Sequence, residues 1–249
     1  MALHERAQAE GLTGGGREGE PAEAVAALAG IESRVVRCRR CPRLVEWRER
    51  VASEKRAAYA GEQYWGRPLP GFGDPRARVY VLGLAPAAHG GNRTGRIFTG
   101  DRSGDFLFAA LHRAGFASQP NSERRGDGLE LRDAFIAAAV RCAPPANRPL
   151  TSERDNCLPY AGEELAAMSS VRVVLCLGGF AWDAAARLVG LRPRPRFGHG
   201  AEAPAADGRR LLGCFHPSQQ NTFTGRLTPP MMDEVLGRAG ELAGLPDSR

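Results

Sequence analysis

Residues 79–96 read VYVLGLAPAAHGGNRTGR, a short apolar strand followed directly by a loop of small residues and glycines. Such a loop lets the backbone approach a ligand closely, and its free amides can bind a phosphate or a polarised carbonyl. The loop lacks the Lys-Ser/Thr pair of a Walker loop and the glycine spacing of a dinucleotide fingerprint. The stretch therefore predicts a strand end that binds some other ligand.

Further apolar runs follow at wide spacing, and helical periodicity fills the stretches between them. The expected strands are residues 79–82, 136–140, 171–177 and 211–215, and the expected helices are 105–114, 151–168 and 180–188. This alternation predicts a three-layer α/β/α sandwich around a central, mostly parallel four-stranded sheet. Ligands bind such sheets at the carboxyl ends of the strands.

The 249 residues are expected to form one folded domain, residues 29–249, preceded by a flexible N-terminal segment, residues 1–28. The first 28 residues are rich in Gly, Ala and Glu, and they show no sustained apolar period apart from a short helical stretch at 22–28. Residues 31–55 then predict helical segments that carry Cys38 and Cys41, with a break at Pro42.

Four of the six cysteines are paired by spacing. Cys38 and Cys41 form a CxxC pair, and fourteen residues separate Cys142 from Cys157. Because reducing compartments keep thiols free and thiolates are soft ligands, this pattern favours a metal or an iron–sulfur cluster over disulfides. Four thiolates also suit zinc, so the spacing alone leaves both groups open.

The chain is moderately basic, with 34 Lys and Arg against 28 Asp and Glu and a formal net charge of +6. This excess suits a polyanionic partner. No stretch approaches the roughly 18 uninterrupted apolar residues of a membrane span, and the N-terminus is not an apolar signal core. We therefore expect a cytoplasmic protein without a membrane-bound part.

Two side chains near expected strand ends are candidates for ligand contact. Phe98 follows the glycine loop among Thr, Gly, Asp and Arg, which favours a ring that lines a surface and stacks on a base. His216 follows the last expected strand and begins the polar run HPSQQNTFTGR (216–226). A histidine followed by so many polar side chains favours a functional over a packing role.

Four motifs carry a resemblance to a known family. GLAPAAHGGNRTGR (83–96), FTGDRSGD (98–105), VRCAPPANRP (140–149) and HPSQQNTFTGRLT (216–228), together with the spaced cysteines, look like the family-5 uracil-DNA glycosylases, or UDGb, of the uracil-DNA glycosylase superfamily. The resemblance runs from about Cys38 to about Arg226.

The resemblance implies a monomeric three-layer enzyme of base excision repair. Such an enzyme hydrolyses the N-glycosidic bond of a deaminated base flipped out of DNA, leaves an abasic site and works near the nucleoid. The resemblance also implies a structural 4Fe-4S cluster, held by Cys38, Cys41, Cys142 and Cys157.

The chemistry of such a reaction assigns a role to His216. Negative charge develops on the departing base and positive charge on the sugar, so a hydrogen bond to the base oxygen stabilises the transition state. The resemblance gives His216 this role. The residues expected to surround the base are Gly83, Ala85, Ala87, Phe98, Ala138 and His216.

Two positions depart from the pattern of the superfamily. Most relatives keep an acidic or amide side chain after the first strand, where this chain has LAPA (84–87). His89, Asn92 and Asp101 are then the candidates for activating water; alternatively the base leaves before water attacks, which we favour. Ala138 replaces a base-reading Asn, and without that hydrogen-bond filter the pocket is expected to accept hypoxanthine and xanthine besides uracil.

Contacts to DNA phosphates, or a wedge into the strand, are expected from the polar residues of the last motif. They are Ser218, Gln219, Asn221, Thr224 and Arg226, with charge added by Arg93, Arg96 and Arg102. The basic run RPRPRFGH (192–199) is either a further phosphate contact or a surface linker.

Two other functions remain open. A non-catalytic DNA or RNA binder would explain the missing acid after the first strand. A glycosylase that traps the abasic sugar covalently would need a nucleophilic histidine in a basic insertion, and only His89 is available for that role in GGNRTGR and its surroundings.

Overall fold

A single mixed sheet forms the centre of the protein. The computed structural model describes residues 20–246, and within this range six strands pair in the order β1-β3-β2-β4-β6-β5. The strands are Phe72–Gly73 (β1), Val79–Gly83 (β2), Ala134–Ala138 (β3), Val173–Leu177 (β4), Glu202–Pro204 (β5) and Arg210–Cys214 (β6). The inner strands β3, β2, β4 and β6 run parallel, whereas β1 and β5 pair antiparallel at the two edges.

The predicted strands are the four inner ones, with ends shifted by a few residues. The prediction of a mostly parallel four-stranded sheet is nevertheless wrong in extent, because two antiparallel strands complete the edges. β1 spans only two residues and β5 only three. Segments this short carry no readable period-2 pattern, and Gly and Pro within them read as loop.

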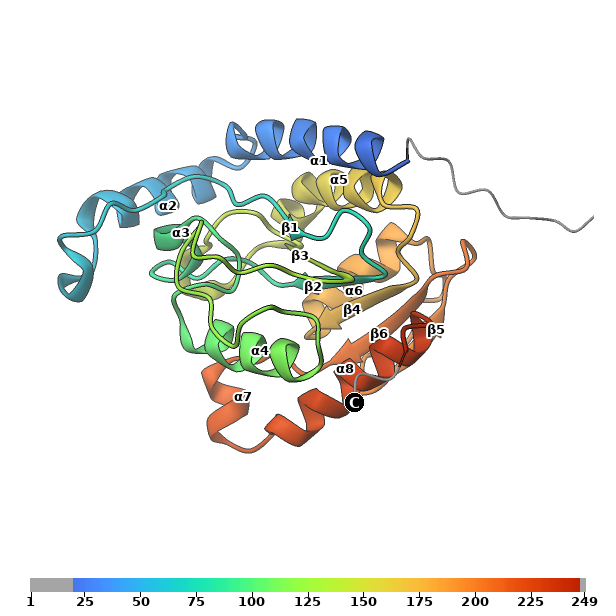
Figure 1. The fold of residues 1–249 in the computed structure, drawn as a ribbon. Helices are drawn as coiled ribbons and strands as arrows, with labels where there is room; N and C mark the ends of the chain where they lie inside the picture. The colour runs from blue at the N-terminus through green and yellow to red at the C-terminus, as the bar shows by residue number, and fades with distance from the viewer. Residues whose placement is uncertain (1–19, 247–249) are drawn as a thin grey trace, which may run out of the picture.

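The inner strands are buried on both faces, which explains their continuous apolar sequence. Along β2, Val79 and Val81 point into one core, which also contains α4 (Arg102–Arg113) and α8 (Pro229–Leu242). Tyr80 and Leu82 point into the other core, with α5 (Thr151–Ala167) and α6 (Gly179–Leu188). The sheet therefore lies between two helical layers, as Figure 1 shows.

The other helices cover the sheet or carry loops at its carboxyl edge. α1 (Glu20–Val36) packs along α5, and α2 (Pro42–Glu54) follows it toward α3 (Gly91–Thr94), as Figure 1 shows. α7 (Gln219–Phe223) follows β6. The three helices predicted between the strands correspond to α4, α5 and α6, and the segments predicted over 31–55 form the end of α1 and α2, with the break before Pro42; α8 was not predicted.

The N-terminal prediction falls partly outside the described residues. The helical stretch at 22–28 forms the first part of α1, while residues 1–19 are not described. The run RPRPRFGH packs against α6: Trp182 donates its indole N–H to the carbonyl of Pro195 (2.8 Å), and the ring of Phe197 contacts the ring of Trp182. No helix in the described part of the chain is both long and apolar enough to cross a membrane.

Candidate active site

The carboxyl ends of the inner strands bring several predicted residues together. Gly83 ends β2 and pairs with Ala138, the last residue of β3. Gly178 follows β4, and its N–H donates to the carbonyl of Cys214 at the end of β6 (2.8 Å). His216 lies two residues beyond. The sheet therefore places these four positions along one edge, where α/β proteins bind ligands.

Phe98 and His216 lie side by side at this edge. Their ring centroids are 5.9 Å apart with an interplanar angle of 36°. The phenyl ring covers Gly83, since a Cβ at that glycine would lie 2.7 Å from Cε2 of Phe98. An aromatic face and an imidazole thus border the same small region.

The backbone of Phe98 depends on a glycine behind it. Phe98 has a φ of 53°, a left-handed conformation that non-glycine residues rarely adopt. Gly104, in the first turn of α4, presses against the Phe98 carbonyl: a Cβ there would lie 1.9 Å from that oxygen. The FTGDRSGD motif therefore needs its second glycine for packing and not for ligand contact.

His216 is held by its neighbours and is neutral at neutral pH. The side-chain amide of Asn221 donates to the His216 carbonyl (2.8 Å), and a Cβ at Gly178 would approach the His216 Cβ to 3.2 Å. Burial lowers the pKa of His216 from 6.5 to about 4. A neutral imidazole donates one hydrogen bond, which suits an oxygen that gains negative charge.

The Asn and the first Arg of the GGNRTGR loop mainly hold the loop in place. Asn92 is fully buried and donates its amide N–H to the carbonyl of Arg48 (3.1 Å). Arg93 donates to the carbonyls of His89 (2.8 Å) and Gly100 (3.1 Å), and its guanidinium lies 4.0 Å from the ring centroid of Tyr59. Neither side chain faces an open surface.

Arg96 is also committed to the protein. Its guanidinium donates two hydrogen bonds to Asp127 (2.9 and 2.5 Å) and one to Ser122 (2.7 Å). Arg96 and three backbone N–H groups keep the pKa of Asp127 well below its usual range, against the opposing effect of burial. The pair anchors the chain between α4 and β3 to the glycine loop.

The remaining candidates for activating water have partners as well. Asp101 caps α4, its Oδ1 accepting from the backbone N–H groups of Ser103 (2.9 Å) and Gly104 (3.0 Å), and burial raises its pKa. His89 shares a hydrogen bond between its Nδ1 and the hydroxyl of Tyr64 (3.0 Å). Burial and the charges of Arg56 and Arg93 lower the pKa of His89.

The pocket alanines differ in their surroundings. Ala138 is buried in the same core as Phe98. Ala85 packs instead against the cluster that contains Cys41, Cys142 and Cys157. Ala87 accepts the backbone N–H of Asn92 through its carbonyl (3.1 Å). The loop that follows β2 therefore runs directly alongside the cysteines.

The last motif forms an exposed face around α7. Ser218 caps this helix, while Gln219 and Thr224 lie on the surface. The ring of Phe223 is 67% exposed, and the guanidinium of Arg102 lies 5.3 Å from its centroid. Arg226, also exposed, covers the ring of Phe215 at 4.7 Å. Two of the predicted DNA-contacting arginines, Arg102 and Arg226, thus border one surface beside His216.

The four spaced cysteines gather in one region. All six cysteines of the chain are described and free, and Cys41, Cys142 and Cys157 are buried in a common cluster. Burial raises the pKa of Cys157 to about 11. Cys38 lies beside this cluster, because the guanidinium of Arg48 contacts both the Cys38 carbonyl and the Cys142 sulfur. Within residues 20–246, no three His, Cys, Asp or Glu side chains are arranged to hold a metal ion as they stand.

The surroundings of these sulfurs fit a thiolate-bound group. The buried guanidinium of Arg48 donates through Nη1 to the Sγ of Cys142 (2.9 Å), and the backbone N–H and charge of Arg141 act to lower the pKa of Cys157 against the effect of burial. Nε of Arg48 has no hydrogen-bond partner among the described residues. Positive charge and N–H donors beside sulfur are what a negatively charged iron–sulfur or zinc centre requires.

Sequence reasoning missed several residues that support this site. His199 accepts the backbone N–H of Phe215 through Nδ1 (3.2 Å), and its ring lies 5.0 Å from that of Phe215. Gly178 and Tyr64 were not singled out either. The glycine pair after β4 was a readable signal, since it follows an apolar strand, whereas the partner of His89 could not be found without the fold.

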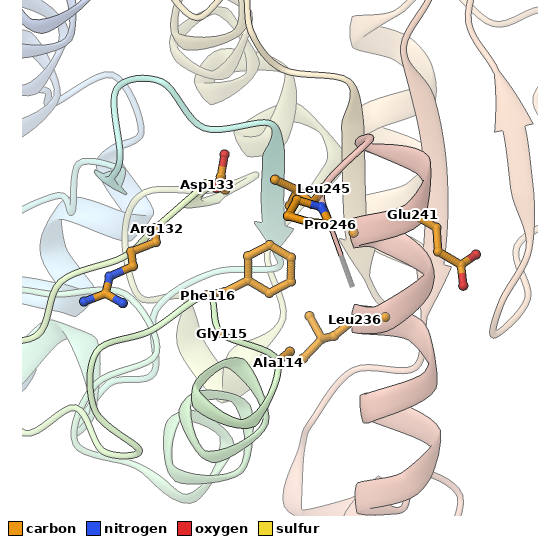
Figure 2. A pocket seen from close by; sticks show the side chains of 11 residues that line it. Ala114, Gly115, Phe116, Arg132, Asp133, Leu236, Glu241, Leu245 and Pro246 are labelled. Atoms are coloured by element: carbon orange, nitrogen blue, oxygen red, sulfur yellow. The ribbon is translucent and has the colours of Figure 1, made fainter. Parts of the chain in front are cut away.

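A cavity of about 460 Å³ lies elsewhere and is not part of this site. It is bordered by α4, α8 and the segment before β3, and Phe116, Leu236 and Leu245 point into it in Figure 2. Asp133, which also lines it, precedes β3 and therefore marks the amino end of the sheet. The cavity and His216 lie at opposite strand ends.

Comparison with known proteins agrees with the motifs. Residues 70–239 match the family profile described as Uracil DNA glycosylase superfamily. The chain is 57% identical over 211 residues to a type-5 uracil-DNA glycosylase of Mycobacterium tuberculosis, covering 84% of this chain and 79% of that protein. Type-5 uracil-DNA glycosylases of Thermus thermophilus and Pyrobaculum aerophilum are 53% and 49% identical; the matches cover 84% and 85% of this chain and 94% and 92% of those proteins.

The profile match includes Cys142, Cys157 and the His216 motif, and the matches to these relatives cover 84–85% of the chain. The chain belongs to the uracil-DNA glycosylase superfamily, and within it to the type-5 uracil-DNA glycosylases.

Proposed function

We propose that the protein hydrolyses the N-glycosidic bond of uracil flipped out of DNA and leaves an abasic site. The observation that carries the proposal is the adjacency of the Phe98 and His216 rings at the carboxyl edge of the sheet. The names of the type-5 relatives support it.

The two rings divide the work of binding and catalysis. A base inside a duplex is out of reach, so the nucleotide must rotate into the site, where the face of Phe98 stacks on it. The neutral imidazole of His216 donates a hydrogen bond to the base oxygen, and this bond strengthens as negative charge develops there. The low pKa keeps the imidazole uncharged at neutral pH, and the uncharged ring still carries the one N–H that this hydrogen bond needs.

Water attack follows departure of the base. Asp101 caps α4 and His89 is bonded to Tyr64, while Asn92 is fully buried and its amide has no basicity, so none of the three candidates is a free general base. This favours a dissociative reaction, in which the sugar cation forms first and water adds without a general base. The same partners disfavour a covalent role for His89.

The pocket is proposed to accept hypoxanthine and xanthine as well. Gly83 and Ala138 form the paired ends of β2 and β3 and offer no side-chain hydrogen bond to a base. A site that does not read the Watson–Crick edge discriminates weakly between bases that differ there.

The experiment is a single-turnover cleavage panel on matched duplexes that contain uracil, hypoxanthine or xanthine, with alkali to reveal abasic sites. His216→Ala is expected to slow all three reactions by about a hundredfold or more. His112→Ala, which removes an exposed histidine on α4, is the matched control and is expected to act as the wild type.

Three results would contradict these proposals. Unchanged rates in His216→Ala would show that His216 is not the hydrogen-bond donor to the base. Fast release of uracil with no release of hypoxanthine would refute the wide pocket. A protein–DNA adduct on a denaturing gel would indicate the covalent mechanism.

We further propose that Cys38, Cys41, Cys142 and Cys157 hold a structural 4Fe-4S cluster. Such a group would join the segment before α2 to the chain after β3 and to α5, and would supply rigidity and not redox chemistry. Iron and zinc analysis of the purified protein, with its visible absorption spectrum, distinguishes the cluster from zinc.

We also propose that the enzyme is a monomer and that it acts in base excision repair in the cytoplasm.

A further inference from the structure

Arg48 is a buried charge without a buried carboxylate. It lies on α2 and is only 2% exposed. The nearest acidic group is Glu49, whose Oε1 is 3.6 Å from Nη2 of Arg48, but that side chain is 44% exposed and pairs with Arg39. A buried guanidinium is costly unless a negative group offsets it.

Arg141, a second buried arginine of this region, shows the contrast. It is 1% exposed, and its Nη2 donates to Oε2 of Glu164 at 2.6 Å, with both side chains almost completely buried. Arg141 thus has a carboxylate of its own. Arg48 has no buried carboxylate, because Glu49 is exposed and is shared with Arg39, so a further negative group near the guanidinium would offset its charge.

The guanidinium of Arg48 is directed at the cysteines. Nη1 donates to the Sγ of Cys142 at 2.9 Å, and Nη2 donates to the carbonyl of Cys38 at 3.3 Å. One side chain therefore joins both cysteine pairs, although they are about a hundred residues apart in the sequence. Thiolates that bind iron or zinc would provide the missing negative charge.

The backbone of Arg48 is connected to the base-binding loop. Its carbonyl accepts the amide N–H of the fully buried Asn92 at 3.1 Å. The backbone N–H of Asn92 donates in turn to the carbonyl of Ala87, and its own carbonyl accepts from Gly66. Asn92 therefore fixes the loop against α2 and not against DNA.

We propose that Arg48 is a positioning residue that couples the four-cysteine group to the base-binding loop, its guanidinium holding the sulfur ligands while its carbonyl holds Asn92. This inference rests on the metal group proposed above. It also gives Asn92 a role: it transmits the position of α2 to the loop between β2 and Phe98.

The test compares the purified Arg48→Gln, Arg48→Lys and Arg50→Gln proteins with the wild type. Arg50 lies on the same helix but is exposed, so it is the matched control. We expect Arg48→Gln to lose iron to a chelator about 10- to 100-fold faster than the wild type. The decrease in visible absorbance measures this loss. Arg48→Lys keeps the positive charge but not the planar guanidinium. Its rate of iron loss is expected to lie between those of the wild type and Arg48→Gln.

Asn92→Ala tests the contact to the loop separately from the contact to the cysteines. It is expected to retain iron as the wild type does but to lower kcat for uracil release, because only the loop is freed. In the Arg48→Gln/Asn92→Ala protein, the loss of kcat is expected to be smaller than the product of the single losses, as coupled residues require.

The outcomes are distinguishable. A wild type that contains neither iron nor zinc and still releases uracil refutes the metal group, and with it this inference. Iron in the wild type with unchanged retention in Arg48→Gln refutes the role of Arg48 alone. If Arg48→Gln does not fold, wild-type retention in Arg48→Lys decides against the proposal in the same way.

Discussion

The phenyl ring of Phe98 rests on the bare backbone of Gly83. A methyl group at residue 83 would lie 2.7 Å from Cε2 of the ring, closer than side-chain contacts allow. The glycine at the end of β2 therefore sets where the ring lies, and through the 5.9 Å contact it sets the distance between Phe98 and His216.

Gly83→Ala is expected to displace the ring and to lower kcat/KM for uracil about as much as Phe98→Ala does. Stacking of a base on an aromatic ring is worth about 1–3 kcal/mol, so the loss should be roughly 5- to 150-fold. The measurement is single-turnover release of uracil. Gly162→Ala on α5, where a Cβ meets an ordinary 3.5 Å contact, is the control and should keep full activity.

The low pKa of His216 predicts how stability depends on pH. The ordinary value is 6.5 and the folded value about 4, so between these values the unfolded chain binds a proton that the folded chain does not. Stability is therefore expected to fall as the pH is lowered through this window. Urea unfolding at pH 7 and pH 5 checks this, and His216→Asn should show a weaker dependence than the wild type.

The same pKa bears on activity. A neutral donor stays neutral down to about pH 4, so kcat/KM, which reports the pKa values of the free enzyme, should show no acid limb near 6.5 caused by His216. A limb near 6.5 that disappears in His216→Asn would contradict the neutral donor.

Asp101 is expected to behave as a helix cap and not as a general base. Asp101→Asn retains a capping oxygen. Its unfolding free energy should therefore stay close to that of the wild type, and its kcat should stay within a few-fold. Asp101→Ala removes the cap of α4 and should cost about 1 kcal/mol in unfolding free energy. A large loss of kcat in a fully folded Asp101→Asn protein would reinstate the carboxylate as the base.

Phe223 is expected to assist flipping of the nucleotide. An exposed ring beside the site can insert into the base stack and occupy the space that the flipped base leaves. Phe223→Ala should therefore slow release of uracil from duplex DNA by about tenfold while affecting single-stranded DNA little. Val25→Ala, another exposed apolar position, on α1, is the control. Equal losses on both substrates would argue against this role.

Arg226 is expected to contact a phosphate. Binding to duplex DNA should weaken with salt, and Arg226→Gln should reduce the slope of log K against log salt by about one unit. Arg96→Gln serves as contrast, because Arg96 is bonded to Asp127 and should affect stability instead of the salt slope. The readout is fluorescence anisotropy over a salt series.

The sequence predicted those elements whose residues form a pattern long enough to recognise. The run from Val79 to Leu82 is apolar because both faces of β2 are buried, so the strand could be identified without its neighbours. The edge strand Phe72–Gly73 could not, because two residues have no period and their partner, β3, lies more than sixty positions away.

The roles of polar side chains were harder to predict than their presence. Arg93 and Arg96 stand in a loop that borders the site, yet a sequence does not show which way a guanidinium points. Arg96 turns inward because Asp127, from a distant segment, meets it there. Phe98 and His216 could be predicted to lie together. Phe98 follows the loop after one strand and His216 follows another, and parallel strands bring such ends to one edge of the sheet.

The two outer strands also limit how molecules of this protein can meet. β1 spans two residues beside Gly71, and β5 ends at Pro204, so each flank of the sheet offers little main chain for a further strand. Short flanks of this kind discourage edge-to-edge pairing between copies. The central strands, which are buried on both faces, are thereby kept from serving as templates for a second molecule.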